Sequence, residues 1–485
     1  MIHSPLLPHL AGYINDRWIS ADAGKRQDVV NPATGEKLAD VPVMGAAETR
    51  RAIASAKRAL ATPADAATRR RWLTAIRDAL LEQQQEIGRI LCLEHGKPWK
   101  EAQGEVQYAA SFFDYYAPLA ETATAPETLP GKVKDCIWTL YKRPVGVVGL
   151  ITPWNFPIAM IAKKIAPALA AGCPSLIKPA PDTPLTMIAL FQIMADRLDL
   201  PKGMVNLVMG DAAQIGGELM HSPDVAMVSF TGSTAVGRLL MQQASPRVKR
   251  LGLELGGNAP FIVLDDADLD AAADGLMINK FRGAGQTCVC ANRVYVQRGV
   301  YDAFAQKLVE RVSKLKVGDG MKDGTDIGPL INANGYAKVK GHLADALDKG
   351  ATLLTGKQPD ALNAGDGLFF TPAVIGNVDD TMQCCQEETF GPLIPLISFT
   401  DDDEVIRRAN DTEFGLAAYV FGKDRARSHR IIAQLHFGHC AYNTGTGPAA
   451  IAPFGGMLSS GLGREGGREG LMEYIEVQTV PDGSH

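Results

Sequence analysis

The chain has 485 residues, which is too long for one hydrophobic core, so we expect two or three domains. It is 46% hydrophobic and 21% charged with a formal net charge of -5, a composition typical of globular proteins that gives no support to nucleic-acid binding. No stretch reaches the roughly 20 apolar residues of a membrane span. Residues 1–18 lack a signal-peptide pattern, so we expect a cytoplasmic protein without a membrane partner.

The eight cysteines are scattered, and their spacing does not predict a disulfide framework. The two close pairs, Cys288 with Cys290 and Cys384 with Cys385, lack the spacing of zinc ligands. We therefore expect no metal site, and the weakly negative charge favours a small-molecule partner.

Apolar periodicity in the first third of the chain predicts helices over 47–61 and 66–93. Residues 126–131 are rich in helix breakers, and 133–141 mix charged and apolar residues as an exposed β-hairpin does. From residue 145, short apolar strands alternate with helices. The predicted strands are 145–152, 174–178, 205–209 and 226–230, and the predicted helices are 158–171, 183–198 and 215–220.

This alternation predicts an α/β fold with a parallel sheet covered on both faces, in which ligands bind beyond the carboxyl ends of the strands. A second alternating series from 259 to 442 predicts a second α/β domain, and residues 474–480 are expected as a further strand. We place a Rossmann-like dinucleotide-binding domain at 1–123 and 146–256 and a catalytic domain at 257–455.

Two glycine-rich segments compete for the phosphates of a dinucleotide. Gly461-Leu-Gly463-Arg-Glu-Gly466 has the fingerprint spacing, but we interpret it as a flexible loop because residues 455–460 are not expected to form a preceding strand. Phe230-Thr-Gly232-Ser233 closes a buried run and opens a helix, where free N–H groups attract a pyrophosphate. A bare strand-to-helix turn is the alternative.

Three further residues are candidates for chemistry. Lys178 ends a predicted strand and either extends to solvent or binds the adenosine ribose. Cys288 lies in a glycine-lined loop whose N–H groups favour a thiolate, unless it is a buried, inert cysteine. Glu254 lies in an apolar run, where burial would raise its pKa towards that of a general base, unless it pairs with a lysine.

Seven motifs in order resemble the aldehyde dehydrogenase superfamily over about residues 13–480. They are Pro153-Trp154-Asn155-Phe156-Pro157, Lys178-Pro-Ala180, Phe230-Thr-Gly-Ser-Thr, Leu253-Glu-Leu-Gly-Gly257, Gly285-Gln-Thr-Cys288, Glu387-Glu388-Thr-Phe-Gly-Pro392 and Pro453-Phe-Gly-Gly456. Residues 253–293 are most similar to succinate-semialdehyde and glutarate-semialdehyde dehydrogenases.

The resemblance implies that Cys288 is the nucleophile, which adds to the aldehyde and then carries a thioester. It assigns the Asn155 amide and the Cys288 N–H to stabilising the tetrahedral oxyanion. Glu254 is then the base that activates water to release the acid.

The resemblance also implies NAD or NADP as cofactor. It assigns to the cofactor site Trp154, Lys178, Ala180, Pro181, Gly232, Ser233, Gly237, Leu255, Glu388 and Phe390. NAD-preferring relatives often carry a glutamate where this chain has Pro181. Without that carboxylate a 2′-phosphate meets no like-charge penalty, so we expect NADP to be accepted.

For the substrate, the resemblance implies an acidic semialdehyde such as succinate semialdehyde, with Phe156 and Phe454 beside it. The semialdehyde enzymes hold the distal carboxylate with an arginine that matches Arg282, a second arginine that aligns with Lys163, and a serine that aligns with Pro448. Two of the three anchors differ, so a longer or neutral aldehyde is an alternative. A thiol ester hydrolase and a catalytically inactive binding protein are alternatives of other classes.

Two further expectations follow from the resemblance. Cys290 is close enough in sequence to form a reversible disulfide with Cys288 as a redox switch. Residues 124–145 and 470–485 are expected to form a small oligomerisation element whose strand edges are exchanged in a homodimer or homotetramer.

Overall fold

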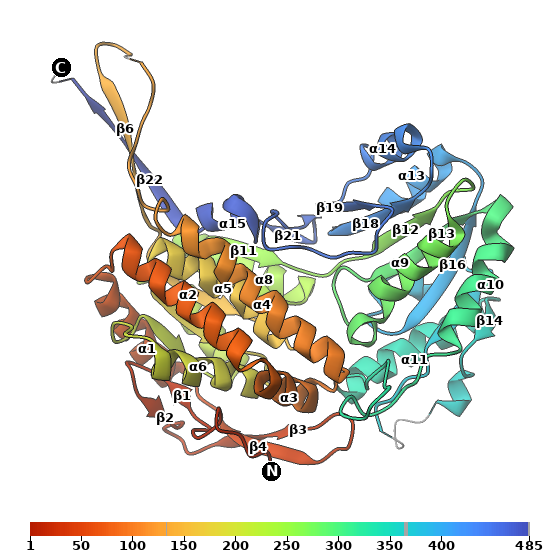
Figure 1. Cartoon of the computed structure of the whole chain (residues 1–485), viewed down its shortest axis with the longest axis horizontal. Helices are drawn as coiled ribbons and strands as arrows, with labels where there is room; N and C mark the ends of the chain where they lie inside the picture. Colours follow the sequence, from red (N-terminus) through yellow and green to blue (C-terminus); the bar gives the residue numbers. More distant parts are fainter. Residues whose placement is uncertain (132, 363–366, 484–485) are drawn as a thin grey trace.

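The computed structural model describes residues 1–131, 133–362 and 367–483. Two α/β units lie side by side, and a narrow β-arm projects from the first of them (Figure 1). The predicted α/β fold class, with a Rossmann-like unit and a second α/β unit, is confirmed. Within the described residues, no helix is both long enough and apolar enough to cross a membrane.

The first unit is built on an eight-stranded sheet. Its spatial order is β2 (Trp18–Ile19), β1 (Gly12–Tyr13), β9 (Val205–Leu207), β8 (Ser175–Lys178), β7 (Val147–Ile151), β10 (Val225–Thr231), β11 (Arg250–Glu254) and β21 (Gly461–Leu462). The strands from β9 to β11 are parallel, whereas β1 and β21 pair antiparallel to their neighbours. The order reverses between β7 and β10, the kind of position where open α/β sheets bind ligands. β21 belongs to this sheet although it lies outside the predicted range.

Apolar side chains of β7 point alternately to the two faces of the sheet, which explains why both faces are covered. Val148 and Leu150 join one hydrophobic core, while Val147 and Ile151 join the core on the other face. The helices of this unit are α1 (Ala46–Leu60), α2 (Ala66–Glu82), α3 (Gln84–His95), α4 (Trp99–Leu119), α5 (Pro157–Ala171), α6 (Leu185–Arg197), α7 (Ala212–His221) and α8 (Thr234–Ala244). The long helix predicted over 66–93 is wrong, because the last turn of α2 tightens at Gln83, whose N–H bonds to the carbonyls of Ala79 and Leu81.

The second unit holds a seven-stranded sheet in the order β14 (Thr352–Thr355), β15 (Ala373–Gly376), β16 (Leu393–Phe399), β13 (Ala291–Gln297), β12 (Ala259–Val263), β18 (Ala417–Phe421) and β19 (His439–Tyr442). All but β14 are parallel to their neighbours. Its helices are α9 (Leu269–Phe281), α10 (Tyr301–Val312), α11 (Ala333–Asp348), α12 (Gln383–Gln386), α13 (Asp402–Asn410) and α14 (Arg425–Ile432).

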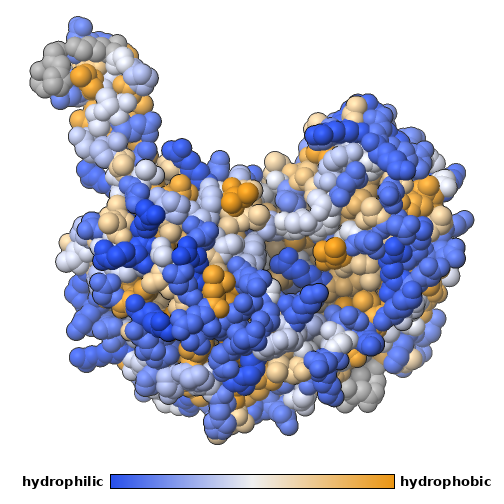
Figure 2. All heavy atoms as spheres, in the orientation of Figure 1, coloured by the Kyte–Doolittle hydropathy of each residue, from blue (hydrophilic) through white to orange (hydrophobic). Residues whose placement is uncertain are grey.

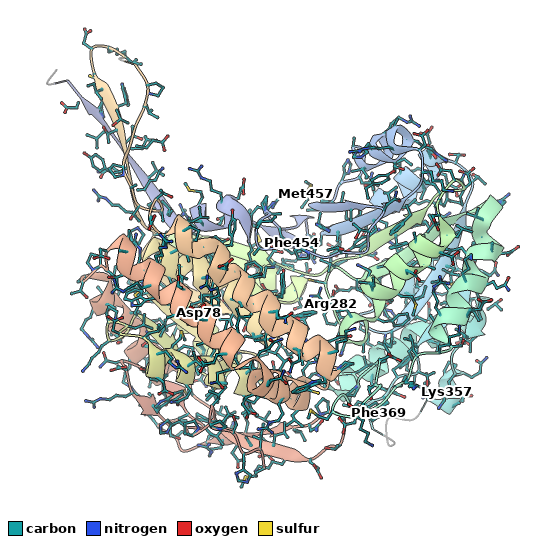
Figure 3. The ribbon with its side chains drawn as sticks, in the orientation of Figure 1. Asp78, Arg282, Lys357, Phe369, Phe454 and Met457 are labelled. Carbon is teal, nitrogen blue, oxygen red and sulfur yellow. The ribbon has the colours of Figure 1, made fainter. Side chains whose placement is uncertain are left out.

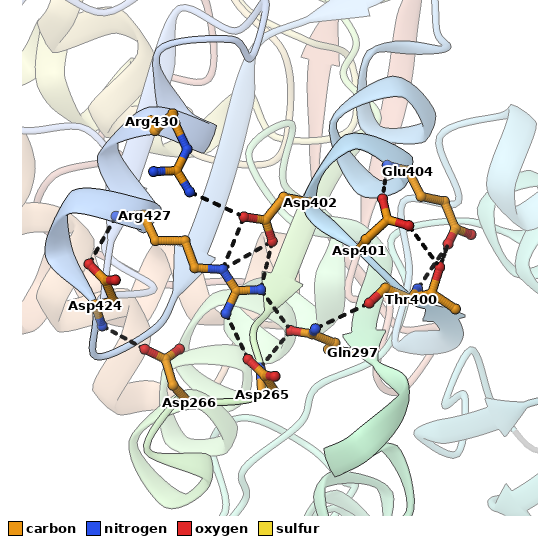
Figure 4. A network of polar contacts seen from close by, with 10 residues as sticks. All are labelled: Asp265, Asp266, Gln297, Thr400, Asp401, Asp402, Glu404, Asp424, Arg427 and Arg430. Atoms are coloured by element: carbon orange, nitrogen blue, oxygen red, sulfur yellow. Dashed lines mark hydrogen bonds and ion pairs between the residues drawn. The ribbon is translucent and has the colours of Figure 1, made fainter.

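A polar network ties α13 and α14 to the carboxyl ends of β12 and β13 (Figure 4). The Arg427 guanidinium lies 2.6 Å from Asp402 and 2.7 Å from Asp265, and it donates to Gln297 at 3.1 Å. A shared, planar donor of this kind fixes the relative orientation of several elements more firmly than isolated surface pairs do.

The projecting arm is a three-stranded antiparallel sheet in the order β22 (Ile475–Asp482), β6 (Ile137–Pro144) and β5 (Glu127–Thr128). β22 pairs with β6 over its whole length, from Ile475 opposite Pro144 to Asp482 opposite Ile137. Residues 132, 484 and 485 of the two predicted ranges lie outside the described residues. Strand β5 falls in the breaker-rich stretch 126–131, within the range 124–145 expected for the oligomerisation element.

Shorter elements complete the chain. They are the β-ribbon of β3 (Arg26–Val30) and β4 (Lys37–Pro42), the pair of β17 (Phe414–Gly415) and β20 (Met457–Leu458), and helix α15 (Gly467–Met472). The expectation that 455–460 holds no strand is wrong, because β20 pairs there with β17. It is only two residues long, and it belongs to no βαβ unit.

The buried carboxylate of Glu105, on α4, pairs with Lys97 and also binds the start of α5. Glu105 lies 2.5 Å from Lys97, and the two side chains are each 1% exposed. The other Glu105 oxygen accepts from the N–H groups of Ile158 and Ala159, at 3.1 and 3.2 Å, in the first turn of α5.

Replacing Glu105 with alanine should strongly destabilise the protein, because it leaves Lys97 charged, buried and unpaired. The expected cost is about 3–5 kcal/mol. We expect the midpoint of thermal unfolding to fall by several degrees. Glu127→Ala is the matched control, since its ion pair with Lys142 involves a half-exposed carboxylate and should contribute little. Equal midpoints for the two variants would contradict the analysis.

Candidate active site

The candidate residues gather where the two sheets face each other. Glu254 ends β11 and Ala259 begins β12, so the chain crosses within a few residues from the carboxyl edge of the first sheet to the amino edge of the second. Cys288 precedes β13 and Glu388 precedes β16. The first sheet thus contributes its carboxyl edge, as expected for an open parallel sheet, and the second contributes its amino edge.

A cleft of about 510 Å³ runs along this junction. Figure 2 shows the molecule hollowed between the arm of β6 and β22 and the lobe of α13 and α14. Eight of the predicted site residues line the cleft: Trp154, Asn155, Gly232, Ser233, Leu255, Cys288, Glu388 and Phe390.

Cys288 sits in a tight turn, closed by the bond from the Cys290 N–H to the Thr287 carbonyl at 3.1 Å. Burial, with a smaller contribution from the Glu388 charge, raises the pKa of the Cys288 thiol to about 12. The Cys288 backbone N–H lowers the pKa of the thiol, in the direction that the loop pattern predicted, but burial has the larger effect. The thiol is protonated at neutral pH.

Asn155 lies close to the nucleophile loop. Its side-chain N–H donates to the backbone carbonyl of Gln286, two residues before Cys288, at 3.0 Å. Its backbone carbonyl accepts from the Lys97 ammonium at 2.9 Å. The Asn155 amide oxygen is buried without a hydrogen-bond partner among the described residues. The second amide hydrogen is not used by the Gln286 carbonyl, so the side chain can still donate to a ligand.

Glu254 belongs to a buried cluster of charges. Its pKa is raised to about 8 by burial and by Glu465, against the opposing charges of Lys163 and Lys164. One of its oxygens has no hydrogen-bond partner within the described part of the chain. The alternative reading as a simple salt bridge does not hold, because both lysines pair with Glu465 instead, at 3.0 Å for Lys163 and 2.5 Å for Lys164.

Glycines make room at the crossing between the sheets. A Cβ on Gly257 would lie 2.6 Å from the Cys288 carbonyl oxygen, and a Cβ on Gly256 would lie 3.2 Å from Glu388. Glu388 accepts from the Gly257 N–H at 3.1 Å, and burial raises its pKa to about 7. Phe390 packs edge-on against Trp154, with ring centres 5.6 Å apart.

The first sheet supplies groups that fit a dinucleotide. Ser233 is the N-cap of α8, so an exposed hydroxyl and the free N–H groups of that helix face the cleft. Gly237 lets α8 approach Leu255, since a Cβ there would meet the leucine at 2.6 Å. Among the described residues, the buried Lys178 ammonium bonds only to the Pro179 carbonyl, at 3.2 Å, and burial lowers its pKa. A buried cation without a carboxylate partner suits an oxygen-rich ligand.

Four of the ten predicted cofactor residues do not line this cleft: Lys178, Ala180, Pro181 and Gly237. The predicted base Glu254 does not line it either. Pro181 borders a separate cavity of about 910 Å³ beside the ribbon of β3 and β4. No group of three or more His, Cys, Asp or Glu side chains is arranged to hold a metal in the parts of the chain that the structure describes.

Figure 3 labels two of the predicted substrate residues, Arg282 and Phe454, and both lie near the junction of the two units. The Arg282 guanidinium stacks 4.4 Å from the centre of the Phe156 ring, and the Lys163 ammonium lies 4.5 Å from that of Phe454. Arg282 makes no ion pair and no hydrogen bond with any described residue, whereas Lys163 is paired with Glu465.

The Cys290 thiol is buried and points to the carbonyls of Lys280 and Ala291, at 3.8 and 3.5 Å. A bond to Cys288 would require these contacts to break. Reversible oxidation of the pair stays a prediction.

The sequence interpretation missed several residues of the site. Asn332, Asn334 and Lys338 line the cleft from the start of α11. Asn332 caps this helix by accepting from the Gly335 N–H, so an N-cap pattern was the available signal. Glu465 was also missed, although it lies inside the glycine fingerprint that we set aside.

The aldehyde dehydrogenase family model matches residues 18–480. The chain belongs to the aldehyde dehydrogenase family. It is 48% identical over 472 residues to glutarate-semialdehyde dehydrogenase of Pseudomonas aeruginosa, with 96% of each chain covered. It is 49% identical over 469 residues to the NADP-dependent succinate-semialdehyde dehydrogenase of Escherichia coli, again with 96% of each covered. A 3-sulfolactaldehyde dehydrogenase of Pseudomonas putida is 46% identical, with 99% of this chain and 98% of the relative covered.

Solved structures agree with this membership. An oxidoreductase from Marinobacter aquaeolei matches this aldehyde dehydrogenase with a TM-score of 0.97, 62% identity and all of both chains covered. Succinate-semialdehyde dehydrogenase from Burkholderia pseudomallei matches with a TM-score of 0.96, 48% identity and 99% of both chains covered. The chain is thus an NAD(P)-dependent aldehyde dehydrogenase.

The raised pKa of Cys288 predicts slow alkylation at neutral pH. We expect the rate of Cys288 modification by iodoacetamide in the cofactor-free enzyme to rise about tenfold per pH unit between about pH 7 and about pH 10, because the reactive thiolate stays a minor species over that range. Peptide mass spectrometry measures the rate, with a small free thiol as the control, whose rate levels off above its own pKa of about 8.5. A plateau for Cys288 below about pH 9 would contradict the buried, neutral thiol.

Proposed function

We propose that this aldehyde dehydrogenase oxidises a small aldehyde with a terminal acid group, such as succinate or glutarate semialdehyde. The observation that carries the proposal is an unpaired guanidinium, that of Arg282, held on the substrate side of Cys288 next to Phe156. Glu101 acts on the Arg282 charge without forming an ion pair with it, so an acidic group at the far end of the substrate would supply the direct partner. The names of the two semialdehyde-oxidising relatives support the same substrate class.

In the proposed reaction the Cys288 sulfur adds to the aldehyde carbon. Its thiol is neutral at rest, so the proton passes to Glu254 as the S–C bond forms, in the fraction of molecules in which this carboxylate is ionised. Glu254 returns this proton to solvent before the hydrolysis step. The tetrahedral oxygen that results is stabilised by the Cys288 N–H and by the Asn155 amide, which Lys97 and the Gln286 carbonyl hold in place.

When bound, NAD or NADP supplies the hydride acceptor, and a thioester is left on Cys288. Ser233 and the N-terminus of α8 would hold the pyrophosphate, Lys178 the adenosine ribose and Glu388 the nicotinamide ribose. Glu254 then removes a proton from water, which attacks the thioester and releases the acid. Because its pKa is about 8, the Glu254 carboxylate becomes more populated as the pH rises towards and beyond 8, and hydrolysis should speed up accordingly.

Both dinucleotides are expected to serve. Pro181 is exposed and brings no carboxylate to the ribose, so a 2′-phosphate would meet no repulsion from this side chain. We further propose that 1–123 with 146–256 is the cofactor domain, that 257–455 is the catalytic domain, and that the arm of β5, β6 and β22 joins subunits of a homodimer or homotetramer.

The acid group of the substrate need not be a carboxylate. The relative named for 3-sulfolactaldehyde covers nearly the whole chain, and a sulfonate would also pair with Arg282. Longer and neutral aldehydes remain the alternatives for the same site.

The test is steady-state kcat/KM for succinate semialdehyde, glutarate semialdehyde, 3-sulfolactaldehyde and butanal, each with NAD and with NADP. We expect an acidic aldehyde to exceed butanal by about 10- to 100-fold, the usual effect of one charge-assisted hydrogen bond. Cys288→Ser should reduce the formation of reduced dinucleotide to background.

Two outcomes would contradict the proposal. A preference for butanal would remove the acidic substrate class. Ester hydrolysis that needs no dinucleotide, without oxidation of any aldehyde, would instead support the thiol ester hydrolase.

A further inference from the structure

One polar group on the substrate side of the site has no partner. The hydroxyl of Tyr108, on α4, is buried and makes no hydrogen bond with any residue in the described ranges. Burying a hydroxyl in this state costs free energy that nearly all folded proteins avoid. A buried hydroxyl without a partner near a substrate site indicates that a ligand group accepts its hydrogen bond.

The Tyr108 ring is held in a fixed place. It packs edge-on against Phe112, with ring centres 5.0 Å apart, and contacts the cluster formed by Phe156, Ala159 and Met160. Met160 also lines the cleft that holds Cys288. A side chain so constrained loses little further entropy when its hydroxyl binds a ligand.

An unpaired cation lies beside the same ring. Within the described ranges, Arg282 has neither an ion pair nor a hydrogen bond, and its guanidinium carbon is 6.0 Å from the centre of the Tyr108 ring. Burial raises the pKa of the Tyr108 hydroxyl, while Lys163 and Arg282 partly oppose the shift. The phenol therefore remains a protonated donor at neutral pH.

Lys163 is not free to take part in the same way. Its ammonium lies 3.0 Å from Glu465, and both side chains are almost fully buried. Glu465 also binds Lys164, and burial of this carboxylate is offset by both lysines, so that its pKa falls to about 2. The charge of Lys163 is therefore already used to keep Glu465 ionised near Glu254.

We propose that the Tyr108 hydroxyl and the Arg282 guanidinium together bind the terminal acid group of the substrate, and that Tyr108, not Lys163, is the second specificity-determining residue. This inference rests on the proposed function. Pro448 offers no side-chain donor to the acid group. The Tyr108 hydroxyl supplies one from a different element, the helix α4.

The experiment compares Tyr108→Phe with the wild-type enzyme on succinate semialdehyde and on butanal, which lacks the acid group. We expect the ratio of kcat/KM for the two aldehydes to fall by about 10- to 100-fold, mainly through a higher KM for the acid, because one hydrogen bond to a charged group is lost. Binding of succinate to the cofactor-free protein, measured by calorimetry, should weaken by a similar factor.

Two further variants separate this role from general damage to the site. Tyr115→Phe, on the same helix two turns further on, should leave the ratio unchanged. Lys163→Met should lower kcat for both aldehydes without changing the ratio, because it disturbs Glu465 rather than the acid group.

An unchanged ratio in Tyr108→Phe, or a change of the ratio in Lys163→Met alone, would overturn the inference while the preference of the wild type for acidic aldehydes stands. If the wild type does not prefer the acid, the proposed substrate class fails, and this inference fails with it. A protein that binds succinate equally well with and without the hydroxyl would also overturn it.

Discussion

The site depends on one steric constraint, the crossing of the chain between Glu254 and Ala259. Here the backbone passes from the carboxyl edge of one sheet to the amino edge of the other within hydrogen-bond distance of Glu388. Gly257 allows the backbone to lie against the Cys288 carbonyl, and Gly455 allows the loop before β20 to lie against Glu254, where a Cβ would be 2.9 Å from the carboxylate. Side chains at these glycines would push the base and the nucleophile apart.

Burial then sets the protonation of the reacting groups. The thiol of Cys288, which lines the cleft half-buried, and the buried carboxyl of Glu254 are both mainly neutral at pH 7, because desolvation raises the pKa of each group. Glu465 is kept ionised by two lysines despite its burial, and its negative charge further raises the pKa of Glu254. The site thus separates a permanently ionised set of structural charges from a neutral pair that ionises during the reaction.

Much of this site could be predicted from the sequence. The strand-helix alternation after residue 145 gave the parallel sheet, and the motifs around Asn155, Glu254 and Cys288 gave the chemistry. Glu465 and its two lysines could not be paired in this way, because they are about three hundred residues apart and no local pattern links them. The unpaired hydroxyl of Tyr108 could not be predicted from the sequence either, since a lone tyrosine in an amphipathic helix is typical of a core position.

Two features of the site went beyond what the sequence patterns predicted. Loop glycines around Cys288 predicted a stabilised thiolate, but burial of the sulfur has the larger effect on its pKa. The rule that ligands bind beyond carboxyl strand ends holds for the first sheet and not for the second, which faces the cleft with its amino edge. Sequence patterns describe one unit at a time, whereas this site is made by the contact between two.

The most direct test of the account is the covalent state of Glu254→Gln after it has been mixed with succinate semialdehyde and NAD or NADP. Without a base to activate water, the enzyme should form one reduced dinucleotide per chain and then stop, with one acyl group bound to Cys288, as shown by intact-mass and peptide mass spectrometry. Full turnover by this variant, or an acyl group on a residue other than Cys288, would contradict the assignment of the nucleophile and the base.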